Sequence, residues 1–158
     1  MEHEHTSGHT APYGRFALEL SIDFVIMYFV MYTMIATLGH LYLNINNVYM
    51  TLMMVAPMAL LMVISMRSMF PSRRVNLAIG AAAVVVFAAS FWAMRTQAAV
   101  EDVQFLRSMI PHHSGAILMC EQAALSDAEI RSLCSDIVGA QQREIAQMQA
   151  ILARLRGG

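Results

Sequence analysis

The sequence predicts an all-α membrane protein, with three transmembrane helices followed by an extracytoplasmic antiparallel helical hairpin. Of its 158 residues, 58% are hydrophobic and 13% are charged, as is typical of membrane proteins. Three apolar segments, at 17–40, 48–67 and 75–94, are long enough to cross a bilayer core of roughly 30 Å, which takes about 20 helical residues. We therefore divide the chain into an N-terminal tract 1–16, a transmembrane region 17–95 and a helical tail 96–158.

The N-terminal tract is mostly polar and contains His3, His5 and His9. Short tracts rich in histidine bind transition metals, so we expect these residues to act as an auxiliary site for metal capture. The first apolar segment is longer than the apolar region of a signal peptide. We therefore expect it to be a retained membrane helix.

Two acidic residues, Glu19 and Asp23, lie four positions apart on one face of the first predicted span. Ionisable residues within a membrane usually face a protein interior or a polar pathway, which favours a pore or a helix bundle formed by oligomerisation. The alternative is that the span begins nearer residue 22, which would leave Glu19 at the membrane interface.

Methionine recurs every fourth residue along the second span. The series comprises Met50, Met54, Met58, Met62 and Met66, with further methionines at 53 and 69. Steps of four advance about 400° around a helix, so the series winds around it as a spiral. Two interpretations remain open: ordinary packing by a flexible hydrophobe, or a path of thioethers that delivers copper to the tail.

The arginines indicate the orientation in the membrane. The loop between the second and third spans contains Arg67, Arg73 and Arg74, whereas the loop between the first and second contains no cationic residue. The positive-inside rule therefore predicts a cytoplasmic N-terminus and a periplasmic tail on the cell inner membrane. The net charge of −1, without a basic stripe, gives no reason to expect nucleic acid as a partner.

The tail has the pattern of helices. We expect one helix over 98–110, a restart after Pro111 leading to a second over 112–125, and a third over 127–155 that opens with a capping box from Ser126 to Glu129. A turn near 127 makes the last two helices an antiparallel hairpin. Residue pairing about this midpoint brings Cys120 to Cys134, His113 to Gln141 and Met109 to Ile145.

Candidate metal ligands are densest over 105–122, FLRSMIPHHSGAILMCEQ. Helical spacing places Met109, one of the two adjacent histidines and Met119 on adjoining strips of one surface. Imidazole combined with thioether is a soft ligand set that favours copper, particularly Cu(I). A structural zinc site would require cysteines at short spacing, and the two cysteines here have thirteen residues between them.

The tail also carries a family resemblance. Its motif reads Asp102-x-x-Phe105-x-x-x-Met109-x-x-His112-His113-x-x-Ala116-x-x-Met119, then Ile137-x-x-x-Gln141-x-x-Glu144-Ile145-x-x-Met148. This pattern resembles the domain of unknown function 305 family over residues 102–152. The resemblance implies a ferritin-like helical domain in an exported or membrane-tethered protein that binds copper and is associated with copper tolerance.

The resemblance also implies roles for individual residues. The metal-facing positions would be Met109, His112, His113, Met119 and Met148. Second-shell or alternative ligands would be Asp102, Gln141 and Glu144. Cys120 and Cys134 depart from the family pattern at facing positions, which suggests a disulfide in an oxidising compartment; the alternative is a thiolate pair that joins the copper site.

The expected function is therefore copper binding for extracytoplasmic sequestration, tolerance or hand-off, with Cu(I) favoured and Cu(II) or Ag(I) as alternatives. A homodimer would complete a four-helix bundle. We expect no enzyme, because the sequence lacks a Gly-rich phosphate loop and the paired Glu-x-x-His motifs of di-iron proteins. Two other classes remain open: a small oligomeric metal transporter that uses Glu19, Asp23 and the Met-rich span, and a structural assembly module without metal.

Overall fold

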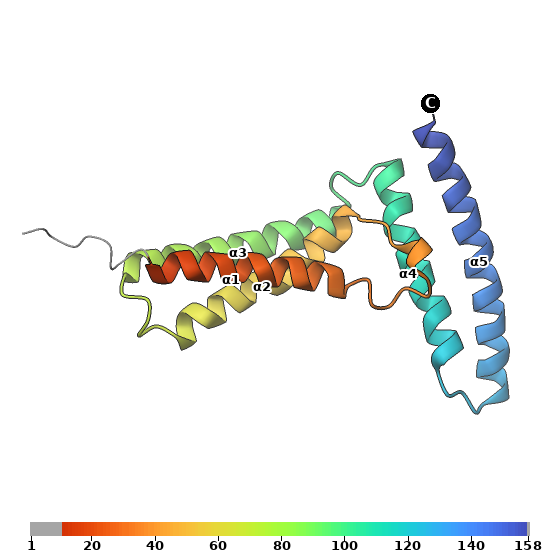
Figure 1. Cartoon of the computed structure of the whole chain (residues 1–158), viewed down its shortest axis with the longest axis horizontal. Helices are drawn as coiled ribbons and strands as arrows, with labels where there is room; N and C mark the ends of the chain where they lie inside the picture. Colours follow the sequence, from red (N-terminus) through yellow and green to blue (C-terminus); the bar gives the residue numbers. More distant parts are fainter. Residues whose placement is uncertain (1–10, 158) are drawn as a thin grey trace, which may run out of the picture. The chain divides into compact units, whose positions relative to one another are not determined.

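The computed structural model describes residues 11–157, and within them the protein is all-α, as predicted, with no strand (Figure 1). The elements are α1 (Ala11–Val30), the 3-10 helix η1 (Leu38–His40), α2 (Ile45–Ser65), α3 (Arg73–Thr96), α4 (Asp102–Gln122) and α5 (Ala128–Arg156). They form two compact units: a first unit of the chain up to Tyr28 with Val48–Ala98, and a second unit of Phe29–Asn47 with Ala99–Gly158. Segment 29–47, which the sequence assigned to the transmembrane region, thus belongs with the tail.

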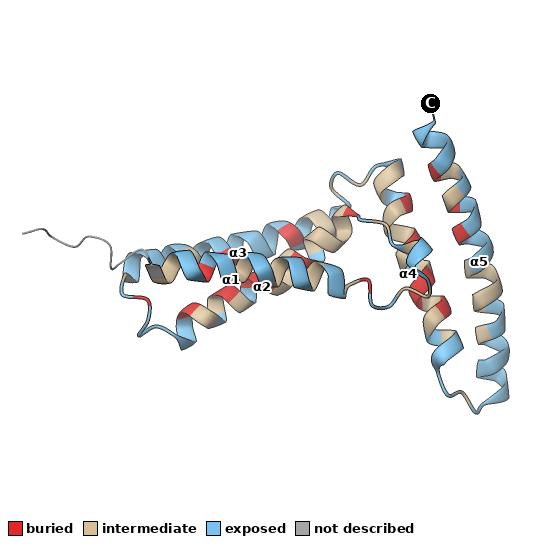
Figure 2. Cartoon of the chain, in the orientation of Figure 1, coloured by how far each residue is buried: buried red, intermediate tan, exposed pale blue. Residues whose placement is uncertain are grey.

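Two helices of the first unit, α2 and α3, are long and apolar enough to cross a membrane. Both expose large apolar side chains, such as those of Leu61, Leu77 and Trp92, and Figure 2 shows exposed positions along most of α3. Exposed apolar surface of this extent needs a nonaqueous neighbour, which lipid would provide. These two helices match the second and third predicted spans to within three residues at each end.

The first predicted span, 17–40, is wrong in extent and in character. Helix α1 ends at Val30, where the backbone changes to 3-10-type hydrogen bonds from Tyr32 N to the Phe29 carbonyl. Its 20 residues include Arg15, Glu19 and Asp23, so α1 is not among the helices apolar enough to span. The apolar residues after Val30 reflect packing in the second unit, where Ala36 and Tyr42 contact the hydrophobic core.

The first unit is held together near the start of α1. Phe16 packs with Val63 and Phe70 in a small core, and its ring meets that of Phe70 edge to face at 5.4 Å. The Tyr13 hydroxyl donates to Asn76 Oδ1 at 2.9 Å. The start of α1 therefore lies beside the start of α3.

The second unit is built on the antiparallel pair α4 and α5. Its core takes buried side chains from both helices, and Figure 2 shows buried positions on both. The core residues are Leu106, Ile110 and Ile117 from α4, with Ile145, Met148 and Leu152 from α5. In each helix they recur at the spacing of one helical face, which is how an amphipathic helix buries its apolar side.

Two local expectations for the hairpin are wrong. Pro111 does not separate two helices, because α4 continues through it from Asp102 to Gln122. Proline removes one backbone hydrogen bond, but the flanking Ile110 is completely buried and holds the helix against the core. Helix α5 is capped by Asp127 and not by Ser126: the Asp127 carboxylate accepts hydrogen bonds from the backbone N–H groups of residues 129 and 130.

A segment of the second unit, residues 31–44, lies against α4; we call it the strap. The completely buried Ser114 Oγ accepts a hydrogen bond from Ala36 N at 2.7 Å and lies 2.8 Å from His40 Nδ1. A Cβ atom on Gly115 would lie 3.4 Å from the Met34 carbonyl oxygen, so the small residue permits the close approach. Ser114 and Gly115 therefore anchor the strap, a role that the sequence did not reveal.

The strap contact is expected to weaken in acid. Burial lowers the pKa of His40 below its ordinary value of 6.5. The unfolded chain then binds more protons than the native state, so this contribution to stability is complete above about pH 6.5 and is lost as the pH falls from there toward the lower native pKa. Hydrogen exchange of strap peptides at about pH 7.5 and about pH 5.5 should show lost protection in acid, and His40→Gln should remove the difference. If protection of the strap peptides depended on pH equally in wild type and His40→Gln, His40 would not be the cause of the acid sensitivity.

Candidate metal site in the hairpin

His113 lies on α4 and connects to both helices of the hairpin. Its Nδ1 atom is 2.9 Å from the Met109 carbonyl oxygen and its Nε2 atom is 2.8 Å from Glu144 Oε2 on α5. A carbonyl oxygen can only accept, so Nδ1 donates to it, and Nε2 is directed at the Glu144 carboxylate on α5. The His113 side chain is only 13% exposed. This is the arrangement of many metal-ligating histidines, in which the second ring nitrogen donates to a backbone carbonyl.

His112 takes a different position. It is exposed, and its ring centroid lies 6.0 Å from that of His113 with an angle of 65° between the rings. Consecutive residues on a helix differ by about 100°, so the two imidazoles leave α4 in different directions. Only His113 is positioned between α4 and α5.

The three predicted methionine ligands are also divided. Met109 is partly buried against the core, and Met148 is one of the buried core residues. Met119 is 56% exposed and lies six residues, or about 9 Å of helix, beyond His113. The structure therefore brings Met109 and Met148 to the core side of the hairpin with His113, whereas Met119 shares the exposed side of α4 with His112.

The remaining predicted residues lie at unequal distances from His113. Asp102 is exposed in the first turn of α4, eleven residues or about 16 Å of helix away. Gln141 lies one turn before Glu144 on α5 and is half-buried. Over residues 11–157, no group of three or more His, Cys, Asp or Glu side chains is placed to hold a metal ion. A site here would therefore depend on thioether sulfur. His3, His5 and His9 lie outside the described residues.

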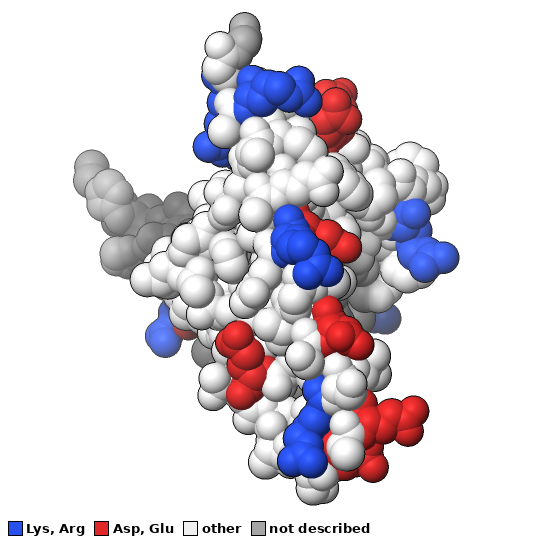
Figure 3. All heavy atoms as spheres, turned by 90° about the vertical axis from the view of Figure 1, so that its right-hand side faces the viewer, with Lys and Arg blue, Asp and Glu red and all other residues white. Residues whose placement is uncertain are grey.

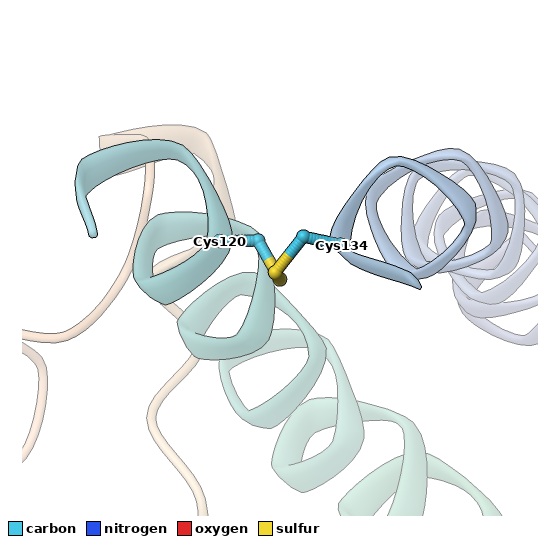
Figure 4. Close-up of a disulfide and its surroundings, with 2 residues drawn as sticks. All are labelled: Cys120 and Cys134. Atoms are coloured by element: carbon cyan, nitrogen blue, oxygen red, sulfur yellow. A yellow bond between two sulfur atoms is a disulfide. The ribbon is translucent and has the colours of Figure 1, made fainter. Parts of the chain in front are cut away.

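A disulfide joins the two helices near the loop end of the hairpin. Cys120 on α4 is bonded to Cys134 on α5, with their Cα atoms 5.3 Å apart (Figure 4). These are the two positions that the hairpin midpoint brings together. Because both sulfur atoms are engaged in the bond, neither is a thiolate that could join the metal ligands.

Charged residues are mixed on the face of the molecule that Figure 3 presents. Arginine and acidic side chains alternate there without forming an extended region of one sign. Nucleic-acid-binding proteins generally show a continuous basic patch or stripe. The face in Figure 3 shows no such continuous basic patch.

Fold and site define a class of small helical proteins, in which two membrane-length apolar helices accompany a hairpin closed by a disulfide. Residues 84–152 match the family model described as Domain of unknown function (DUF305). An uncharacterized protein of Acanthamoeba polyphaga mimivirus is 36% identical over 118 residues, which make up 73% of this chain and 76% of the viral protein. No solved structure matches the chain. The chain belongs to the DUF305 family, and the match begins within α3 and extends through most of α5.

Proposed function

We propose that this protein is a membrane-anchored copper-binding protein whose α4–α5 hairpin holds Cu(I), or Ag(I), for extracytoplasmic sequestration, tolerance or hand-off. The observation that carries the proposal is the orientation of His113. Its Nδ1 atom is fixed by the Met109 carbonyl, and its Nε2 atom faces a carboxylate across the hairpin. The resemblance of the tail to copper-binding relatives supports the same ion.

The ligand set that we propose lies on the core side of the hairpin. His113 Nε2 would bind the ion together with the thioethers of Met109 and Met148, which are soft ligands that select Cu(I) over hard cations. Glu144, now 2.8 Å from Nε2, would offset the charge of a cation in this partly buried position. No enzymatic step is required of these residues.

His112 and Met119 would serve a second copy of the chain. They lie seven residues apart, two turns of α4, on its exposed side. The neighbouring region of the hairpin also exposes Ile130 and Leu133 on α5. We propose that a homodimer covers this surface and completes the helical bundle, with His112 and Met119 at the interface.

The proposed location is the cell inner membrane, with a cytoplasmic N-terminus and a periplasmic hairpin. The arginines at 67, 73 and 74 lie between α2 and α3, on the side that the positive-inside rule makes cytoplasmic. The disulfide fits an oxidising compartment for the opposite side. The hydrogen bond from Tyr13 to Asn76 joins the start of α1 to the start of α3, which is the cytoplasmic end of α3 in this proposal.

The test uses the full chain in detergent, because the strap is part of the second unit and a fragment beginning at residue 96 would lack it. Cu(I) is titrated in competition with a colorimetric chelator into wild type, His112→Ala/His113→Ala, and the control Glu121→Ala/Asp136→Ala, which removes two exposed side chains from the same helices. We expect wild type and control each to bind one Cu(I) per chain more than the histidine variant, because only the hairpin site is lost in that variant. Equal binding by all three proteins would refute the site.

A further inference from the structure

The first unit contains a cavity that has no part in the hairpin site. Its volume is about 120 Å³, and it lies between the first turns of α1 and the C-terminal end of α2 with the loop that follows. Three methionines and one carboxylate are among its lining residues: Met62, Met66, Met69 and Glu19. The rest of the lining comes from Pro12, Arg15, Phe16 and Phe70.

Local backbone structure brings the three methionines to one cavity. Met62 and Met66 are four residues apart and so lie on one side of the helix end. The chain then turns, with backbone hydrogen bonds from Met66 N to the Met62 carbonyl at 2.9 Å and from Met69 N to the Met66 carbonyl at 2.8 Å. These two bonds direct Met69 back to the cavity that the other two methionines line.

Packing accounts for Met62, which contacts the small core of the first unit, but not for Met66 and Met69. A methionine that fills a core is buried, but Met66 is 38% exposed and Met69 is 53% exposed. The core beneath the cavity is already formed by Phe16, Val63 and Phe70, all of which are buried. The thioethers of Met66 and Met69 are therefore accessible from outside while they line a common space.

Two charged side chains line the cavity, the carboxylate of Glu19 and the guanidinium of Arg15. Glu19 Oε1 is 2.8 Å from Arg15 Nε, but the Arg15 side chain is 79% exposed. An exposed ion pair of this kind contributes little to stability, so the carboxylate can exchange the guanidinium for another cation. The three thioethers would act as soft ligands for a monovalent cation, and the single carboxylate would neutralise its charge. Ca²⁺ and Mg²⁺ require more oxygen ligands than the cavity offers.

We propose that Met62, Met66, Met69 and Glu19 form a second metal site, which binds Cu(I) or Ag(I) without histidine. This inference goes beyond the proposed function of the hairpin, since it concerns a different unit and other ligands. It also separates the cavity methionines from other methionines of α2. Those at 53, 54 and 58 do not line the cavity, and they serve as packing residues.

The experiment isolates this site in the full chain in detergent. All proteins carry His112→Ala/His113→Ala, and each is titrated with Cu(I) against a chelator. The test variant adds Met62→Leu/Met66→Leu/Met69→Leu, and the matched control adds Met53→Leu/Met54→Leu/Met58→Leu, which removes as many thioethers from α2. Leucine nearly conserves the volume of methionine, and a thermal unfolding curve verifies that each protein is folded.

We expect the background protein and the control to bind one Cu(I) per chain, and the test variant to bind it at least tenfold more weakly. Glu19→Gln, which keeps the shape of the side chain, should also weaken binding. Absence of Cu(I) binding in the background protein, or equal loss in both triple variants, would overturn this site and leave the hairpin proposal standing. A different result would refute the hairpin site alone. In that result the histidine variant binds as much Cu(I) as wild type, and binding is lost only when the cavity methionines are changed.

Discussion

Replacing His113 by alanine is expected to weaken Cu(I) binding by the hairpin more than 100-fold, whereas His112→Ala should weaken it less than tenfold. Loss of a second-shell partner alone typically weakens metal binding by about 10–100-fold, and a direct ligand contributes more. The difference between the two histidines arises from their directions: His113 faces α5 and is bonded on both ring nitrogens, whereas His112 is exposed.

Chelator competition with the two single variants measures this difference directly. The variants are compared in a chain that already carries Met62→Leu/Met66→Leu/Met69→Leu, so that only the hairpin site is reported. Glu144→Gln serves as a third protein and should weaken binding by about tenfold, because it keeps the shape of the carboxylate but removes its charge. If His112→Ala weakened Cu(I) binding as much as His113→Ala, the proposed site between α4 and α5 would be contradicted.

Removing the disulfide is expected to destabilise the hairpin by about 3 kcal/mol, the value that the chain-entropy model gives for a loop of about 15 residues. The bonded cysteines are separated by 14 positions and join α4 to α5 next to their connecting loop. Cu(I) stoichiometry should remain unchanged, because neither sulfur atom is placed among the proposed ligands.

Hydrogen exchange of peptides from α4 and α5 provides the measurement for the disulfide. Cys120→Ser/Cys134→Ser should exchange faster than wild type near the loop end of the hairpin, and reductant should accelerate only the wild-type protein. Unchanged protection in the double variant would refute the stabilising role. A change in Cu(I) stoichiometry on reduction would show instead that the thiolates are metal ligands.

Local sequence signals predicted a large part of the fold. The apolar runs of α2 and α3 were recognisable because span length depends only on consecutive residues. The pairing of Cys120 with Cys134 followed from one turn position, since a short loop determines which residues of an antiparallel hairpin face each other. Both inferences rest on contacts near in sequence.

Contacts distant in sequence were not predictable in the same way. The apolar residues of the strap extended the first predicted span to residue 40, although they pack on α4. The bond from Ala36 to Ser114 joins positions 78 apart, and no local pattern indicates it. Local hydrophobicity reports that a residue is buried but does not identify its partner.

The arrangement of the candidate residues was not predictable from the sequence. The turn midpoint paired His113 with Gln141, whereas the structure pairs it with Glu144, one helical turn further along α5. A midpoint estimate cannot distinguish two residues on the same face that are one turn apart. Separation of the inward His113 from the outward His112 likewise required the packing of α4 on α5.

X-ray absorption at the copper edge tests the central claim most directly. The sample is the full chain carrying Met62→Leu/Met66→Leu/Met69→Leu and loaded with one equivalent of Cu(I), so that the metal occupies the hairpin. We predict a mixed ligand shell of imidazole nitrogen and thioether sulfur, whose nitrogen contribution disappears in His113→Ala. A shell of sulfur alone, or one that His113→Ala leaves unchanged, would contradict the copper site between α4 and α5.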